Sequence, residues 1–326
     1  MGSFLLRRLL WAAFLFVVAT LVTYLIFFLI PGDPALIAAG SGATATPEFL
    51  AHVRHVLHLD VPIYQQYWLF VWNLIRHGSL GYSFRTGASV RWIVGQDAPV
   101  TGSLVAGGAV LWLAVSIPVG ILSALRPRSL VDRAAMTFVL IGVSAPAVWI
   151  GLILAYVFGF RLGWTPIADY CNFFPSRQVG ACSGPGLWAY HLILPWLTFM
   201  LLFAALYVRL VRANVMEASS EDYVRTARAK GASARRVLIH HVLRNSMLPV
   251  VTIFGMDLGL AIGGAVFTES VFDLHGLGAE LITAALNQDL PLVVGIVMSA
   301  TIAVIVFNLL VDVAYAWLDP RIRIDA

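Results

Sequence analysis

The chain has 326 residues, of which 60% are hydrophobic and only 12% are charged, and its net charge is +4. Soluble domains carry roughly twice that charged fraction and need a largely polar surface, so the composition excludes a water-soluble fold. Nucleic acid binding is also disfavoured, because the basic residues flank apolar segments instead of forming a clustered basic face.

The first apolar run, residues 9–30, follows Arg7 and Arg8. It is longer than the roughly 7–15 residues of a signal-peptide core, and no small-x-small cleavage site closes it. We therefore expect a retained first spanning helix.

Further apolar runs reach the length of about 20 residues that a membrane-spanning helix needs. Irregular backbone and open sheet edges cannot face lipid, so each run is expected to be helical. Together with the first run they predict an all-α membrane protein with six spanning helices. The six runs are Leu9–Ile30, Val100–Leu125, Ala134–Phe160, Trp188–Val208, Met247–Phe267 and Pro291–Ala316.

The orientation follows from the positions of Arg and Lys, which are enriched on the cytoplasmic side. With the N-terminus inside, most of the 21 basic residues fall in cytoplasmic segments. The last outer loop, 268–290, has no basic residue and four acidic ones. An even number of spans returns the C-terminus to the inside, so both termini are expected to be cytoplasmic.

The first outer segment, 31–99, is too long to lack structure. Thr46, Pro47 and Glu48 are typical of a helix start and predict a helix through His58, and Pro62 opens a second helix to about Arg76. Gly78, Gly81 and Gly87 then interrupt the chain. We expect a small helical cap on the outer face.

Three histidines on the first helix of this cap, His52, His55 and His58, are spaced by three residues and could offer imidazoles to a metal. A strict spacing of three drifts around a helix, and no acidic or Cys ligand accompanies the series. We therefore predict an exposed or interfacial helix face and no metal site.

The second outer loop holds the only two cysteines, Cys171 and Cys182. Both would lie on the oxidising side of the membrane, where a disulfide persists. The spacing leaves two alternatives open, a disulfide or two unpaired thiols.

The inner loop 209–246 predicts two helices that meet at Gly231, where a left-handed C-cap is expected. Asp222 suits the first turn of the first helix, and Ser233 can cap the second. On the second helix a basic stripe lies opposite an apolar one. The two stripes are Arg236, His240 and Arg244, and Ala234, Leu238 and Val242. An interfacial helix on anionic lipid and a docking element for a cytoplasmic partner fit this pattern equally.

The run from Tyr223 to Gly231, continued to Leu248 and Pro249, resembles the EAA loop of permease subunits in bacterial ABC importers. The chain matches the family pattern at Ala227, Gly231, Leu248 and Pro249. It departs with Arg225 and Thr226, as does the dipeptide, oligopeptide and nickel permease branch. The segments 30–34 and 318–323 also resemble that branch, whereas His275 and Gln288 depart from it on the outer face.

This resemblance implies the transmembrane fold of a type I ABC importer in the bacterial inner membrane. It divides the chain into a first helix (1–30), an extracytoplasmic segment (31–99), a core (98–317) with the coupling loop 209–246, and a tail (318–326). The residues expected to contact an ATPase are Tyr223, Arg225, Ala227, Arg228, Gly231, Ala232, Arg235 and Arg236. The implied partners are a homologous permease, two ABC ATPase subunits, an extracytoplasmic binding protein and the lipid bilayer.

The chain lacks a phosphate-binding P-loop, because Lys230 is followed by Gly231 where that motif requires Ser or Thr. No catalytic arrangement is evident either. We therefore expect no enzymatic activity and no bound cofactor in this chain, with ATP and Mg on the partner subunits.

Asp257 lies deep in the fifth apolar run, where a carboxylate is costly and usually faces a cavity or a partner. Two interpretations stay open: Asp257 lines the translocation path, or it is a hydrogen-bonded packing residue. Asp312, near the inner end of the last run, is expected to pair with an inner-loop arginine.

The predicted function is import of di- or oligopeptides delivered by the binding protein. Nickel complexes or another small solute remain alternatives within the same architecture. A proton-coupled secondary transporter would need inverted repeats and several intramembrane acids, and a membrane scaffold would need no transport path.

Overall fold

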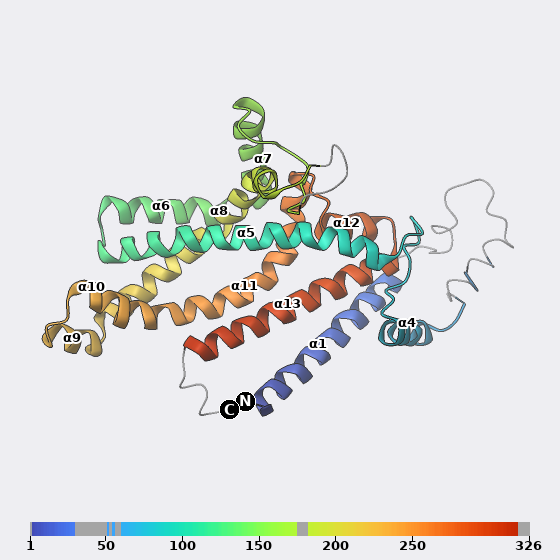
Figure 1. Cartoon of the computed structure of the whole chain (residues 1–326), viewed down its shortest axis with the longest axis horizontal. Helices are drawn as coiled ribbons and strands as arrows, with labels where there is room; N and C mark the ends of the chain where they lie inside the picture. Colours follow the sequence, from blue (N-terminus) through green and yellow to red (C-terminus); the bar gives the residue numbers. More distant parts are fainter. Residues whose placement is uncertain (1, 30–50, 52–53, 56–59, 175–181, 319–326) are drawn as a thin grey trace. The chain divides into compact units, whose positions relative to one another are not determined.

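The computed structural model describes residues 2–29, 51, 54–55, 60–174 and 182–318. Its helices are labelled in Figure 1, and the chain divides into two compact units. The first comprises residues up to 101 together with 275–306, and the second comprises residues 102–274 with the segment that begins at Phe307. Helices dominate both units, as the composition predicts.

The first unit holds helices α1 (Gly2–Leu29), α4 (Ile63–His77) and α12 (Leu277–Leu286), the start of α5 (Val90–Leu125) and most of α13 (Leu290–Leu318). The predicted helix after Pro62 is confirmed as α4, which ends in a left-handed Gly78. The predicted helix from Thr46 to His58, with His52 and His58, lies outside the described residues. His55 is exposed, and its Nδ1 lies 3.0 Å from Asp60 Oδ2.

A buried carboxylate fixes the loop between α4 and α5 in the first unit. Asp289, 1% exposed, precedes α13 and accepts hydrogen bonds from the Ser83 hydroxyl and from the backbone N–H groups of Phe84 and Arg85. A buried carboxylate is stable only when donors surround it, which these groups provide. The loop between α4 and α5 is therefore tied to the start of α13. Of the four acids in segment 268–290, Asp289 and Glu269 are buried.

The second unit is organised around α8 (Pro185–Ser220), which contacts α6 (Leu130–Ser144), α7 (Ala147–Leu154) and α11 (Arg244–Val271). Helix α5 also approaches α8 closely at Gly107. A Cβ added at this residue would lie only 2.1 Å from the Trp196 ring. Small residues of this kind let helices pack tightly in a bilayer, where lipid removes the hydrophobic drive between them.

Four described helices are long and apolar enough to cross a membrane, and a bent pair adds a fifth candidate. The four are Val90–Leu125, Pro185–Ser220, Ala234–Val271 and Leu290–Leu310. Each contains or largely overlaps a predicted apolar run. The first predicted run coincides with α1, whose described side chains form a shorter apolar stretch, Leu10–Ile26.

The predicted apolar run Ala134–Phe160 forms a bent pair of helices and not one straight helix. The chain bends by 108° between α6 and the α7 segment, which continues as the π-helix η1 (Ala155–Arg161). The break lies at Ala145, which is extended, and Pro146, which precedes α7. Proline lacks the N–H for an α-helical bond and disfavours the helical region for the residue before it.

Candidate functional site

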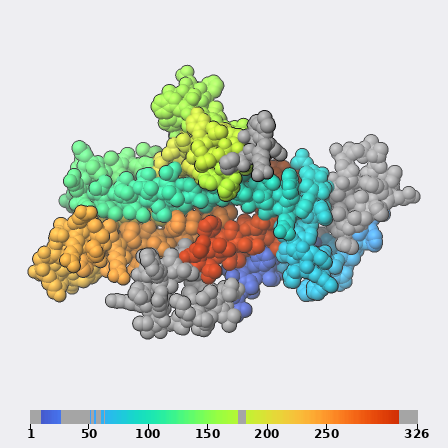
Figure 2. Space-filling view, in the orientation of Figure 1, coloured from blue at the N-terminus to red at the C-terminus, as the bar shows by residue number. Residues whose placement is uncertain are grey.

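The loop 209–246 connects two long helices of the second unit. Helix α8 continues to Ser220, and α10 (Ala234–Val237), η2 (Leu238–Leu243) and α11 form one helical segment, Ala234–Val271. At 1.5 Å per residue, α8 runs about 18 Å beyond the predicted apolar run that ends at Val208. The short α9 (Asp222–Ala229) joins the two helices and lies at the surface of the unit with α10 (Figure 2).

The predicted left-handed turn at Gly231 is confirmed, with φ +79°. The N–H of Gly231 donates to the Arg228 carbonyl at 2.9 Å, and that of Ala232 donates to the Ala227 carbonyl at 3.2 Å. These bonds satisfy carbonyls that the end of α9 leaves free. Ser233 occupies the N-cap position of α10 as predicted, but its side chain makes no capping hydrogen bond.

Apolar side chains attach this loop to its unit, and charged ones face outward. Val224, Val237 and Val242 are at most 2% exposed. The predicted coupling residues Tyr223, Arg225, Arg228, Gly231, Arg235 and Arg236 are exposed, and Ala227 and Ala232 are half-buried. The exposed ion pair between Arg225 and Asp222 (3.3 Å) is the one salt bridge of the tip within the described ranges. The structure thus brings the coupling residues together on one exposed tip.

The predicted basic stripe of Arg236, His240 and Arg244 is exposed, whereas the predicted apolar stripe is only partly right. Ala234 is exposed, and the buried positions are Val237 and Val242. The π turn η2 explains the difference, since a spacing of five residues puts Val237 and Val242 on one face. A pattern based on 3.6 residues per turn could not show this.

An ion pair that the sequence analysis missed joins α5, α6 and α8 near the turn between α5 and α6. Arg212 on α8 donates to both carboxylate oxygens of Asp132 on α6. The donor atoms are Nε, at 2.7 Å, and Nη2, at 3.0 Å. The Ser123 hydroxyl on α5 and the Arg128 N–H (2.8 Å) also donate to Asp132. Bidentate pairs of this type fix orientation as well as contributing energy. Helix α8 leads to α9, and helix α5 leads into α6. The bonds to Asp132 therefore hold α5 and α8 in one arrangement.

The cap at Asp132 had a signal in the sequence, whereas its pair with Arg212 had none. Ser129 and Asp132 have the spacing of a capping box, and the Asp132 N–H does donate to the Ser129 hydroxyl at 3.2 Å. Asp312 had been expected to pair with an inner-loop arginine. Its side chain lies outside the described residues, and Asp132 is the acid that Arg212 contacts.

Asp257 is buried in α11 and accepts a hydrogen bond of 2.8 Å from the Tyr207 hydroxyl on α8. Tyr207 in turn packs on Trp112, which stacks on Phe203 with ring centroids 4.4 Å apart. The indole N–H of Trp112 finds no hydrogen-bond partner in the described part of the chain. A buried polar group of this kind is costly unless water or a ligand satisfies it. Asp257 therefore belongs to a polar and aromatic cluster between spanning helices.

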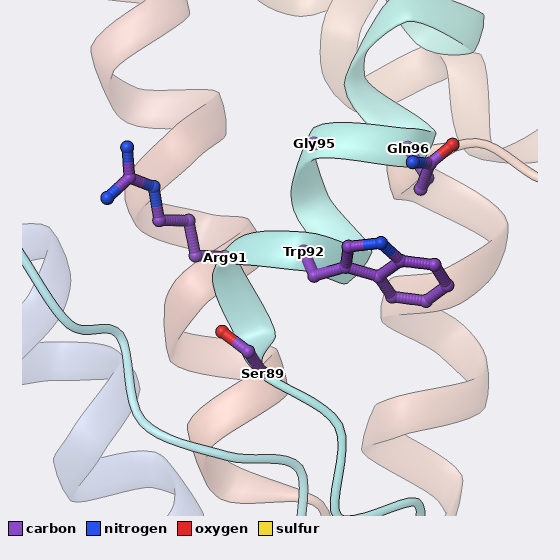
Figure 3. A pocket seen from close by; sticks show the side chains of 5 residues that line it. All are labelled: Ser89, Arg91, Trp92, Gly95 and Gln96. Atoms are coloured by element: carbon purple, nitrogen blue, oxygen red, sulfur yellow. The ribbon is translucent and has the colours of Figure 1, made fainter.

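A surface pocket of about 390 Å³ lies at the start of α5 in the first unit and is lined by Ser89, Arg91, Trp92, Gly95 and Gln96. Figure 3 shows that Arg91 and Trp92 point away from one another and that no set of polar groups converges in it. Binding sites usually combine an enclosed apolar wall with convergent polar groups, so this pocket is a weak candidate.

Cys171 and Cys182 are joined as a disulfide in the second unit. Backbone hydrogen bonds from Asn172 to Cys182 (3.2 Å) and from Gly184 to Asn172 (2.8 Å) close the same loop. His191 Nε2 lies 3.9 Å from the Cys182 sulfur. These three side chains come together, but sulfurs bonded to each other are not the thiolates that bind metals.

Comparison with known proteins places the chain among transport proteins. The family described as binding-protein-dependent transport system inner membrane component matches residues 116–324, and its N-terminal counterpart matches residues 1–105. The chain is 36% identical to a probable peptide ABC transporter permease protein of Sinorhizobium fredii, over 99% of this chain and 100% of the relative. It is also 36% identical to the dipeptide transport system permease protein DppB of Escherichia coli K12, over 99% of both chains.

Among solved structures, an amino acid ABC transporter crystallised with histidines is similar with a TM-score of 0.51. The similarity covers 68% of this chain and 92% of the other, at 12% sequence identity. At that identity the comparison concerns the fold alone.

Replacing Arg212 with Met should destabilise the protein by about 2–4 kcal/mol, because the Asp132 carboxylate would stay buried without its cation. The thermal unfolding midpoint of the purified protein measures this loss. Arg209→Met, an exposed change on the same helix, is the control. We expect Asp132→Asn combined with Arg212→Met to recover part of the loss. Equal midpoints for the Arg209 and Arg212 variants would contradict the assigned role.

Proposed function

The chain belongs to the family of inner-membrane components of binding-protein-dependent transport systems, and we propose that it is the subunit through which di- or oligopeptides enter the cell. The exposed tip formed by α9 and the Gly231 turn carries this proposal, because it presents a basic surface at the end of two long helices. The peptide substrate is supported by full-length relatives that are named for peptides and dipeptides.

We propose six spanning helices with both termini in the cytoplasm. The four long helices, α1 and the bent α6–α7 pair supply the spans. In this topology α9 faces the cytoplasm, and the disulfide loop and α4 face the outside. The distribution of Arg and Lys supports this orientation.

The proposed partners are a homologous permease, two ABC ATPase subunits that carry ATP and Mg, and an extracytoplasmic binding protein. The eight coupling residues would form the contact with one ATPase. Closure of the ATPases would displace the tip, and the Asp132–Arg212 pair would pass the displacement from α8 to α5 and α6. The displaced helices would alternate between outward-open and inward-open arrangements.

Asp257 is proposed to line the translocation path, where its carboxylate would meet a substrate cation such as a peptide amino group. Its burial beside Tyr207 and the unsatisfied Trp112 N–H supports a polar route between α5, α8 and α11. The competing interpretation, a packing role alone, predicts effects on stability without effects on substrate range.

The experiment that tests the function is uptake into vesicles that contain this chain with its partner subunits. We expect uptake of labelled dipeptides to need ATP and the binding protein and to persist when an ionophore abolishes the proton gradient. Loss of uptake with the ionophore would instead indicate a proton-coupled transporter. A nickel complex and a free amino acid serve as competing substrates, and preference for either would replace peptides as the substrate.

Replacing Gly231 with Val should uncouple transport from ATP hydrolysis. A Cβ at Gly231 would meet nothing within 4 Å, so the cost is the positive φ itself, about 1–2 kcal/mol for a residue with a side chain. The ratio of peptide transported to ATP hydrolysed should fall while ATPase activity persists. Gly231→Asn, which tolerates the left-handed region, should retain coupling. Coupled transport in the Val variant at the wild-type ratio would refute this placement.

Replacing Asp257 with Asn should lower the uptake rate of peptides with a free amino group more than that of N-acetylated ones. Tyr207→Phe is the matched control, because it removes the hydrogen bond and keeps the carboxylate, whereas Asn removes the charge and keeps an oxygen that can accept from Tyr207. If Asp257 only packs, both variants should keep the substrate range of the wild type. Unchanged uptake and range in Asp257→Asn would therefore discard the path role.

A further inference from the structure

Helix α4 of the first unit has three distinct faces. One face is packed: Tyr67, Phe70 and Leu74 contact a core cluster with Tyr24 of α1 and Leu290, Val294 and Met298 of α13. A second face is exposed and polar, with Gln65, Asn73, Arg76 and His77. The third face is exposed but apolar, with Tyr64, Trp68, Trp72 and Ile75. We call this third face the aromatic stripe.

The aromatic stripe is both compact and open. Its four side chains are between 46% and 75% exposed. At about 100° per residue they fall within an arc of roughly 80°, between the packed face and the polar face. The packed face and the aromatic stripe together form the apolar surface of α4. The first unit covers only the packed face. An exposed apolar stripe beside a polar face suits a partner in which an apolar region adjoins a hydrated one.

The contacts between α4 and α1 indicate at which level of the membrane α4 lies. The Tyr67 hydroxyl lies 3.0 Å from Thr20 Oγ1, and the Tyr24 hydroxyl donates to Gln66 at 3.3 Å. Tyr24 is five residues before the end of α1 at Leu29, about 8 Å along the helix. Figure 1 shows α4 nearly end-on beside α1, which runs across the view, so the two axes cross steeply. A helix that crosses the outer part of a spanning helix in this way lies close to the membrane plane.

The chemistry of the stripe fits the boundary between lipid tails and headgroups. Trp and Tyr concentrate at this level because each has an apolar ring with a polar group. Helix α1 also exposes apolar side chains at Leu21, Val22 and Leu25, which are close in sequence to the Thr20 and Tyr24 contacts with α4. The Arg76 guanidinium lies 5.7 Å from the centre of the Trp72 ring, at the edge where phosphate groups would lie.

We propose that α4 is an in-plane membrane helix whose aromatic stripe binds the headgroup region of the bilayer. The segment was expected to be a small helical cap on the outer face, and the proposal assigns this cap a lipid partner. It also predicts that Arg76 contacts lipid phosphates and that the polar face points to water. The leaflet rests on the proposed topology, but the contact with lipid does not depend on any transported substrate.

The test is spin labelling of single introduced cysteines in the assembled complex, reconstituted into phosphatidylethanolamine and phosphatidylglycerol vesicles. Both native cysteines of this chain are bonded to each other, so within this chain only the introduced residue reacts. Labels replace Tyr64, Trp68 or Trp72 on the stripe and Gln65 or Asn73 on the polar face. Collision with oxygen, which enters lipid, and with a water-soluble nickel chelate reports the surroundings of each label.

We expect the oxygen-to-nickel ratio to be several-fold higher on the stripe than on the polar face. Equal ratios on the two faces would show an aqueous cap and overturn the proposal. Protection from both reagents on the stripe would show that protein covers it, and this result would also overturn the proposal.

A second measurement keeps the stripe nearly intact. Trp68→Phe and Trp72→Phe each remove one indole. The difference in fluorescence between the wild type and each variant is the contribution of that indole, and lipids brominated near the headgroup should reduce this difference. Failure of peptide transport in the uptake experiment would leave both readouts unaffected, so the two proposals fail separately.

Discussion

Close approach of helices to α8 is the constraint on which the second unit depends. Lipid is as apolar as the side chains it meets, so helices in a bilayer associate through packing and polar contacts. Gly107 on α5 allows contact with Trp196, and a Cβ at Gly142 on α6 would lie 2.7 Å from Ala205. These contacts bury the middle of α8 and make it the common neighbour of α5, α6, α7 and α11. The position of the α9 tip follows, because α8 leads directly to it.

Three buried carboxylates in the described part of the chain join elements that lie far apart in the sequence. Asp132 joins α5, α6 and α8 through its bond with Arg212, and Asp257 joins α11 to α8 through Tyr207. Asp289 does the same in the first unit between the α4–α5 loop and α13. A buried carboxylate without donors is costly, so each of these acids tolerates only a narrow range of neighbours. Such residues specify one arrangement among many that apolar packing would accept.

The sequence predicted most of the helices, because length and apolar composition are local properties. The Pro62 start of α4 and the Gly231 turn were also readable, since proline and glycine restrict or permit particular backbone angles. The bend at Pro146 was missed because the apolar run on either side is uninterrupted. The π turn at η2 shifts the buried face in a way that no regular period reveals, and the Asp132–Arg212 pair joins residues 80 positions apart. Contacts at that separation need the fold.

The unbroken segment from Ala234 to Val271 has a mechanical consequence. Between Asp257 and Ala234 it measures about 35 Å at 1.5 Å per residue. A tilt of about 5° centred on Asp257 therefore sweeps the far end through an arc of about 3 Å, comparable to the rise of two helical residues. The ratio between the displacement of the Ala234 end and the displacement near Asp257 applies in both directions. A large stroke at the arginine-rich end becomes a fine adjustment beside Tyr207, and a small change of shape beside Tyr207 is magnified at that end.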